Sequence, residues 1–163
     1  MTMTQRMFKF MGTKNGRKLE RLSARWFSYS LMTRFYTRMN GLKYNHPLLL
    51  TTKGRKTGKE STVVLPWFEI NNKVVICGSV GGRPKDPDWA RNIRKNPDVT
   101  ARVYGQKLAL KARLAEGAER AACWDYLVNR VPDYAVYQKR ADGIRILPVI
   151  ILERPDGKQI VRN

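Results

Sequence analysis

The chain has 163 residues, with 32 Lys and Arg, 13 Asp and Glu and a formal net charge of +19. This length is typical of one domain with a real core, and the positive charge predicts a polyanionic neighbour: nucleic acid, an anionic membrane surface or an acidic coenzyme tail. The single histidine, His46, argues strongly against a His/Cys zinc site and a Ser–His–Asp triad.

The first 40 residues form a basic segment in which Glu20 is the only acid. Apolar side chains recur at helical spacing from Lys18 to Met39, with Arg17, Arg21 and Arg25 on another face, so the pattern predicts a basic amphipathic helix ended by Asn40–Gly41. Two interpretations stay open: a helix that packs on the rest of the protein with a solvated outer face, or a peripheral contact with an anionic membrane. We therefore expect a helical segment at 1–40 and a β-rich domain at 41–163.

Strand patterns dominate the rest of the chain. Asn71–Asn72 predicts a hairpin turn, Asp88–Lys95 and Glu116–Arg130 predict helices, and Pro148 predicts an edge or bulge in the last strand. The predicted strands are Leu48–Lys53, Ser61–Ile70, Lys73–Ser79, 99–103, 108–114 and Ile144–Glu153. The sequence predicts an α+β protein, mainly β, with an antiparallel, closed or partly open barrel.

Two Gly-rich turns carry the chemistry of the sequence. Gly54–Gly58 places two cations and a hydroxyl on a Gly-flanked turn, which suits a phosphate, and Ser79–Gly82 forms a second turn ahead of Trp89. Together they predict a phosphorylated, ring-bearing ligand. On its own, the first turn is more typical of an ordinary basic hairpin.

Five motifs occur in a fixed order: TT-x-GRKTG, LPW-F, S-x-GG, P-x-W and a late Y-x-x-Y. In this order the chain resembles the deazaflavin-dependent nitroreductase family from about residue 47 to residue 153. The resemblance implies a split β-barrel of about six antiparallel strands with an N-terminal amphipathic helix and inserted short helices. It also implies an oxidoreductase that transfers hydride from reduced coenzyme F420 to a quinone, a nitro compound or an activated alkene.

The resemblance assigns site residues motif by motif. It implies that two tyrosines, Tyr134 and Tyr137, are catalytic, because their hydroxyls would donate a hydrogen bond to the acceptor. The implied coenzyme-binding residues are Arg55, Lys56, Thr57, Val64, Leu65, Pro66, Ser79, Gly81, Gly82, Trp89 and Asn92. Core packing remains an alternative for Trp89 and for the tyrosine pair.

The chain departs from the family pattern at Ser61 and Val80, where many members carry Arg and Lys. The lost cations leave open another cofactor on the same barrel: flavin mononucleotide (FMN), a haem-derived ligand or a fatty acid. A basic nucleic-acid-binding module is a further alternative, although the sequence shows no helix-turn-helix, zinc-finger or RNA-recognition signature and we expect no specific nucleic-acid partner.

The remaining expectations concern location and partners. Cys77 and Cys123 are expected to be buried thiols in a reducing compartment. No apolar stretch approaches the roughly 20 residues of a membrane-spanning helix, so we expect a cytoplasmic protein, peripheral on the inner face of the cell membrane. The expected partner is a small-molecule electron acceptor such as a lipophilic quinone, and the expected assembly is a monomer or a weak homodimer.

Overall fold

The computed structural model describes residues 10, 13–27, 30–39 and 46–160. The chain divides into two compact units, one made of residues 1–51, 62–66 and 101–108 and the other of residues 52–61, 67–100 and 109–163. The predicted boundary near residue 40 lies outside the described residues, as does the predicted helix end at Asn40–Gly41, and both stay predictions.

The basic segment forms two helices, α2 (Lys14–Phe27) and α3 (Leu31–Met39). The prediction of one helix over Lys18–Met39 is therefore wrong. The reason is a helix cap, because the Ser30 hydroxyl accepts a hydrogen bond from the Thr33 N–H at 2.9 Å. A serine at this position satisfies an N–H group of the first turn and so begins a new helix.

The strands of the described residues are hydrogen-bonded in the order β2-β1-β5-β6-β7-β4-β3. Where one strand was predicted over Ser61–Ile70, two form, because Pro66 between them has no N–H for a sheet ladder. The strands are β1 (Leu48–Lys53), β2 (Glu60–Leu65), β3 (Phe68–Ile70), β4 (Lys73–Cys77), β5 (Asp98–Val103), β6 (Gln106–Leu114) and β7 (Val149–Glu153). With five α-helices among the described residues, this sheet confirms the α+β prediction.

Four strands form an antiparallel group in which β4 pairs with β3 and β7, and β7 also pairs with the part of β6 that belongs to the second unit. The predicted turn at Asn71–Asn72 is confirmed, since both residues have the left-handed φ values of 51° and 61° that a type I′ hairpin needs. The prediction that Pro148 marks an edge or bulge is wrong. β7 is paired on both sides and begins just after Pro148, whose carbonyl accepts the Gly78 N–H at 2.9 Å.

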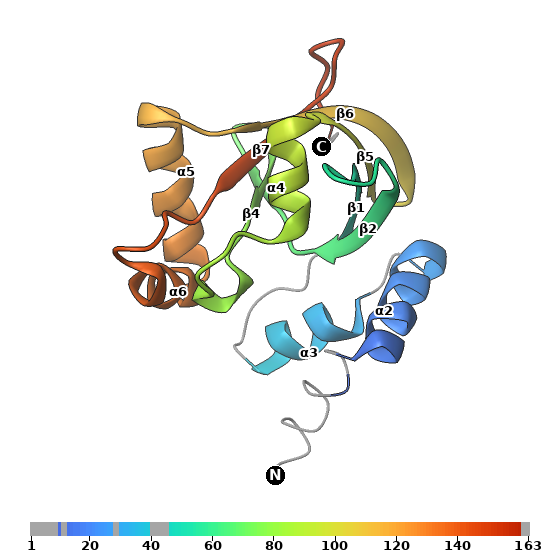
Figure 1. Ribbon diagram of the computed structural model, residues 1–163, viewed down its shortest axis with the longest axis horizontal. Coiled ribbons are helices and arrows are strands. Elements are labelled where there is room, and N and C mark those ends of the chain that lie inside the picture. The colour runs from blue at the N-terminus through green and yellow to red at the C-terminus, as the bar shows by residue number, and fades with distance from the viewer. Residues whose placement is uncertain (1–9, 11–12, 28–29, 40–45, 161–163) are drawn as a thin grey trace. The chain divides into compact units, whose positions relative to one another are not determined.

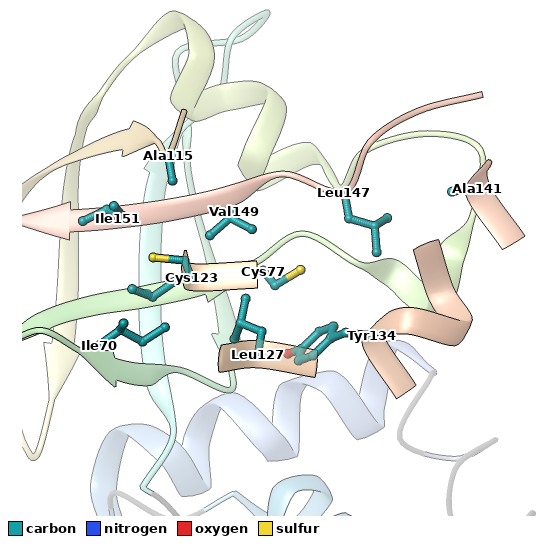
Figure 2. Close-up of a cluster of buried hydrophobic side chains, with 11 residues drawn as sticks. Ile70, Cys77, Ala115, Cys123, Leu127, Tyr134, Ala141, Leu147, Val149 and Ile151 are labelled. Atoms are coloured by element: carbon teal, nitrogen blue, oxygen red, sulfur yellow. The ribbon is translucent and has the colours of Figure 1, made fainter. Parts of the chain in front are cut away.

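Helices α5 (Gly117–Arg130) and α6 (Asp133–Ala141) cover this part of the sheet, and α5 contacts both β3 and β7. Figure 1 shows α5 and α6 on one side of the β4–β7 pair. Their buried side chains meet those of β4 and β7 around Leu127, which is fully buried (Figure 2).

Cys77 and Cys123 are buried free thiols, as predicted, and burial raises the pKa of Cys77 to about 12. No helix of the described residues is both long enough and apolar enough to cross a membrane.

An ion network joins β4, β6, α5 and β7 in the second unit. Arg113 donates to both oxygens of Glu119, at 2.6 and 2.9 Å, and to Glu153 at 2.8 and 3.1 Å. Lys73 adds a hydrogen bond to Glu119 at 2.8 Å. The hydrogen bonds from Arg113 and then Lys73 lower the pKa of Glu119 from its ordinary 4.5 to about 2.

Acid is expected to remove the stabilisation that this network provides. Because the folded-state pKa of Glu119 is depressed, its contribution is present above about pH 4.5 and is lost as the pH falls toward about 2. Since Glu119 is about a third exposed, the loss should be about 1 kcal/mol at most. Urea unfolding of the wild type and of Glu119→Gln at pH 6 and pH 3 checks this. The two proteins should differ at pH 6, the difference should be clearly smaller at pH 3, and an equal difference at both would contradict it.

Candidate functional site

The first Gly-flanked turn is a closed loop between β1 and β2. The Gly54 N–H donates to the Lys59 carbonyl at 2.8 Å, and the Gly58 N–H donates to the Gly54 carbonyl at 2.8 Å. These bonds use the backbone internally and leave Lys56 and Thr57 exposed. In the part of the chain that the structure describes, the Lys56 ammonium makes no hydrogen bond or ion pair, so its charge is available to an anion.

Arg55 is held from one edge by helix α4 (Asp88–Lys95). Its Nη1 donates to Asp88 Oδ1 at 2.9 Å and to Asn92 Oδ1 at 3.1 Å. Among the described residues, Nε and Nη2 have no partner, and the side chain is 20% exposed. The guanidinium is therefore oriented by one edge while the other edge keeps donors that can bind a phosphate or a carboxylate.

Asn92 anchors this loop through three hydrogen bonds. The buried Asn92 Oδ1 also accepts the backbone N–H of Arg55 at 3.1 Å, while its Nδ2 donates to Thr52 Oγ1 at 3.2 Å. The amide thus joins α4 to both the end of β1 and the loop. Trp89 on the same helix is 7% exposed, which agrees with core packing. Contact of Trp89 or Asn92 with a coenzyme stays a prediction.

The second turn has an unusual backbone. Val80, Gly81 and Gly82, the residues of the 3₁₀ turn η1 (Val80–Gly82), have φ values of 45°, 63° and 78°. A left-handed β-branched residue such as Val80 costs free energy, and such strain is concentrated at functional sites. Ser79, which directly precedes this turn, is half-buried.

The two glycines of this turn have different surroundings. A Cβ on Gly82 would lie 2.5 Å from the Tyr137 carbonyl oxygen and 2.8 Å from Arg140 Cβ, so Gly82 packs directly on α6. A Cβ on Gly81 would meet nothing within 4 Å. The space beside the Gly81 Cα is therefore open, and contact of Ser79, Gly81 or Gly82 with a coenzyme stays a prediction.

The tyrosine pair lies on α6, with ring centroids 6.3 Å apart and planes at 87°. Tyr134 is 5% exposed and points into the buried cluster toward Leu127 (Figure 2). Tyr137 is half-buried, and the Arg140 guanidinium lies 5.7 Å from its ring centroid. Burial, followed by the charge of Asp133, raises the pKa of Tyr137, so its hydroxyl remains a hydrogen-bond donor at neutral pH.

The predicted segment Val64, Leu65 and Pro66 belongs to the other compact unit, on β2 and directly after it. Val64 and Leu65 are half-buried and Pro66 is exposed. A role for these three residues in coenzyme binding stays a prediction.

Sequence reasoning missed Arg145, which the structure places against the second turn. Its side chain is 10% exposed, pairs with Asp86 at 2.7 Å and donates to three backbone carbonyls around the turn. The signal in the sequence is a single arginine between Ile144 and Ile146 within an apolar run. That run was interpreted as a strand, whereas the Leu147 N–H bonds to the Gln138 side chain instead of to a neighbouring strand.

Comparison with known proteins gives consistent matches over this region. The family model of the F420H(2)-dependent quinone reductases matches residues 28–154. The F420H(2)-dependent quinone reductase Rv1261c of Mycobacterium tuberculosis is 32% identical over 110 residues, which cover 66% of this chain and 72% of the relative.

Two solved structures are similar in both sequence and fold. An F420-H2 dependent reductase, FDR-A, is 40% identical with a TM-score of 0.58, and the match covers 66% of this chain and 93% of that one. A chain described as a domain-swapped dimer is 36% identical with a TM-score of 0.58, covering 75% and 93% of the two chains. The similarity to FDR-A confirms the predicted split-barrel fold.

Proposed function

The chain belongs to the F420H(2)-dependent quinone reductase family, and from this premise we propose that it is an oxidoreductase that uses reduced coenzyme F420 to reduce a quinone. The observation that carries the proposal is the Arg55–Lys56–Thr57 loop, in which α4 orients the guanidinium and the neighbouring ammonium is exposed. When bound, the deazaflavin supplies the hydride.

The residues of the loop suit the anionic part of the coenzyme. The unpartnered edge of Arg55 can bind a phosphate by two donors, Lys56 adds a point charge, and the exposed Thr57 adds a hydroxyl. The open backbone at Gly81 offers space for close approach. At Val80 the second turn has no cation, but Arg140, which donates to the Gly81 carbonyl, lies beside it.

On the acceptor side, Tyr137 is the better placed of the two tyrosines, because Tyr134 is almost fully buried. A quinone that receives a hydride also takes up one proton to become the hydroquinone. A neutral Tyr137 hydroxyl can donate a hydrogen bond to the quinone oxygen and so stabilise the negative charge that develops there. Nitro compounds and activated alkenes place negative charge on an acceptor in the same way and are further candidate substrates.

Titration of the purified protein with oxidised coenzyme F420 tests the proposal. We expect saturable changes in coenzyme fluorescence at micromolar concentrations, and oxidation of the reduced coenzyme when a soluble quinone is added. FMN serves as the competing ligand. Absence of any spectral change with F420, or tighter binding of FMN, would argue against this function.

We also propose that the protein works at an anionic membrane surface, where a lipophilic quinone resides. Helix α2 supports this: Leu19 and Leu22 are 45% and 44% exposed on a helix whose Arg25 is also exposed. Exposed leucines beside cations suit the lipid interface. A cytoplasmic location on the inner face of the membrane, and a monomeric or weakly dimeric state, are part of the same proposal.

Replacing Leu19 and Leu22 with serine is expected to weaken binding to vesicles that contain anionic lipid by roughly tenfold, because two apolar side chains no longer enter the interface. Vesicle sedimentation measures the effect. The matched control is Tyr126→Ser, which removes a side chain of similar exposure, 43%, on α5. Equal binding by all three proteins would contradict the membrane proposal and leave the reductase proposal intact.

A further inference from the structure

Arg145 contacts the carbonyls on both sides of the second turn. Its Nη1 donates to the Gly78 carbonyl at 3.2 Å, its Nη2 to the Ser79 carbonyl at 2.8 Å and its Nε to the Arg83 carbonyl at 2.8 Å. All three guanidinium nitrogens are thus used within the protein. A residue so buried and so fully bonded holds the turn in place and does not itself contact a ligand.

The direction of these carbonyls fixes the direction of the amides that follow them. Because a trans peptide is planar, a carbonyl that points to Arg145 sends the next N–H the opposite way. The Gly78 and Ser79 carbonyls therefore orient the N–H groups of Ser79 and Val80 away from Arg145. Neither N–H donates to a backbone carbonyl of the described residues, so both remain available to an oxygen acceptor outside the turn.

The same arginine connects the second turn to helix α4. Arg145 pairs with Asp86 at 2.7 Å, and Asp86 also pairs with Arg94 of α4. The carboxylate is 13% exposed, so this pair is shielded from solvent. Two other residues of α4, Asp88 and Asn92, accept hydrogen bonds from Arg55 of the first loop. Arg145 and α4 thus join the two turns in one network of charged and amide side chains.

We propose that Arg145 is a positioning residue for the coenzyme, which fixes the second turn so that its Ser79 and Val80 amides present donors to an oxygen of the bound deazaflavin. The proposal rests on the reductase function proposed above. The positioning role depends on the planar guanidinium, which donates to three carbonyls at once. A lysine at this position would keep the charge beside Asp86 but could not span the three carbonyls.

Arg145→Lys is the direct test. We expect the dissociation constant of oxidised F420, measured by fluorescence, to rise at least tenfold, while the KM for a soluble quinone stays within twofold. The midpoint of thermal unfolding should fall less than in Arg145→Ala, because the pair with Asp86 is kept while bonds to the carbonyls are lost. The matched control is Arg113→Lys, which alters another multiply bonded arginine that does not touch the turn and should leave F420 binding unchanged.

Arg145→Ala provides a second variant. Added guanidinium ion at millimolar concentration is expected to restore part of its F420 affinity, and methylammonium is not. The inference is overturned if Arg145→Lys binds F420 as the wild type does, or if Arg113→Lys weakens binding equally. A wild-type protein that fails to bind F420 would instead overturn the proposed function, so the two failures are distinguishable.

Discussion

Replacing Arg55 and Lys56 together with alanine is expected to weaken F420 binding by roughly 100-fold or more. A hydrogen bond to a charged group contributes about 1.5–3 kcal/mol, and about 1.4 kcal/mol corresponds to a factor of ten in affinity. The variant removes the free edge of the guanidinium and the exposed ammonium, which together face the anionic part of the ligand in our proposal. Fluorescence titration with the oxidised coenzyme measures the effect.

Two controls separate binding from folding in this experiment. Lys59→Ala removes a nearby exposed cation and should change affinity by less than threefold, which shows that the effect is not one of net charge alone. The unfolding free energy of the double variant should fall by about 1 kcal/mol at most, since Arg55 loses an ion pair with an Asp88 side chain that is 77% exposed. A double variant that binds F420 normally would remove the basis for the proposed function.

Gly82→Ala should be the most destabilising single change at the site, with a loss of about 3 kcal/mol or more. The new Cβ would lie 2.5 Å from the Tyr137 carbonyl oxygen, and the residue would keep a left-handed φ of 78°. Backbone atoms of α6 have little room to move away, and the conformation alone costs about 1–2 kcal/mol. The midpoint of thermal unfolding is expected to fall by roughly 10 °C.

Gly81→Ala is the matched control, because Gly81 has a similar φ of 63° but its Cβ would meet nothing within 4 Å. It should lose only about 1–2 kcal/mol, from conformation alone. Because the added methyl group would enter the open space beside the turn, we expect it to weaken F420 binding. Equal destabilisation by the two substitutions would show that the packing of Gly82 on α6 contributes nothing to stability.

The two turns have a common structural element in α4. The helix holds the first loop through Asp88 and Asn92, and the segment that leads into it carries Asp86, the partner of Arg145. Substitutions at Asn92 and at Arg145 should therefore both act on coenzyme affinity through the position of backbone groups. By contrast, a substitution at Lys56 should lower coenzyme affinity because it removes a charge that attracts the ligand directly.

Local patterns in the sequence were sufficient for several elements. The helix Asp88–Lys95 and the strand Leu48–Lys53 form with the predicted bounds, and the Asn71–Asn72 turn forms as a left-handed pair. In each case the deciding interaction lies within a few residues: a proline that limits a helix, an alternating apolar pattern or a turn residue that tolerates positive φ. The ordered motifs also identified the family, because they combine several such local features.

Contacts between distant residues decided most of the rest. The local cap at Ser30, which helical periodicity alone does not reveal, divides the basic segment into two helices. By contrast, pairing with strands far away in the sequence makes β7 an interior strand, although it follows a proline. Arg55 appeared in the sequence as a phosphate ligand, but only the structure shows that Asp88 and Asn92 hold one edge of it.

The sequence by itself predicted the two Gly-rich turns, the tyrosine pair and the family. Tertiary structure alone decided which polar atoms are used within the protein and which are left for a ligand. Arg145 illustrates the physical reason: a buried guanidinium must find acceptors, and its acceptors lie some 60 residues away at Gly78, Ser79, Arg83 and Asp86. Such pairings depend on how the chain folds back on itself, and no local pattern of residues specifies them.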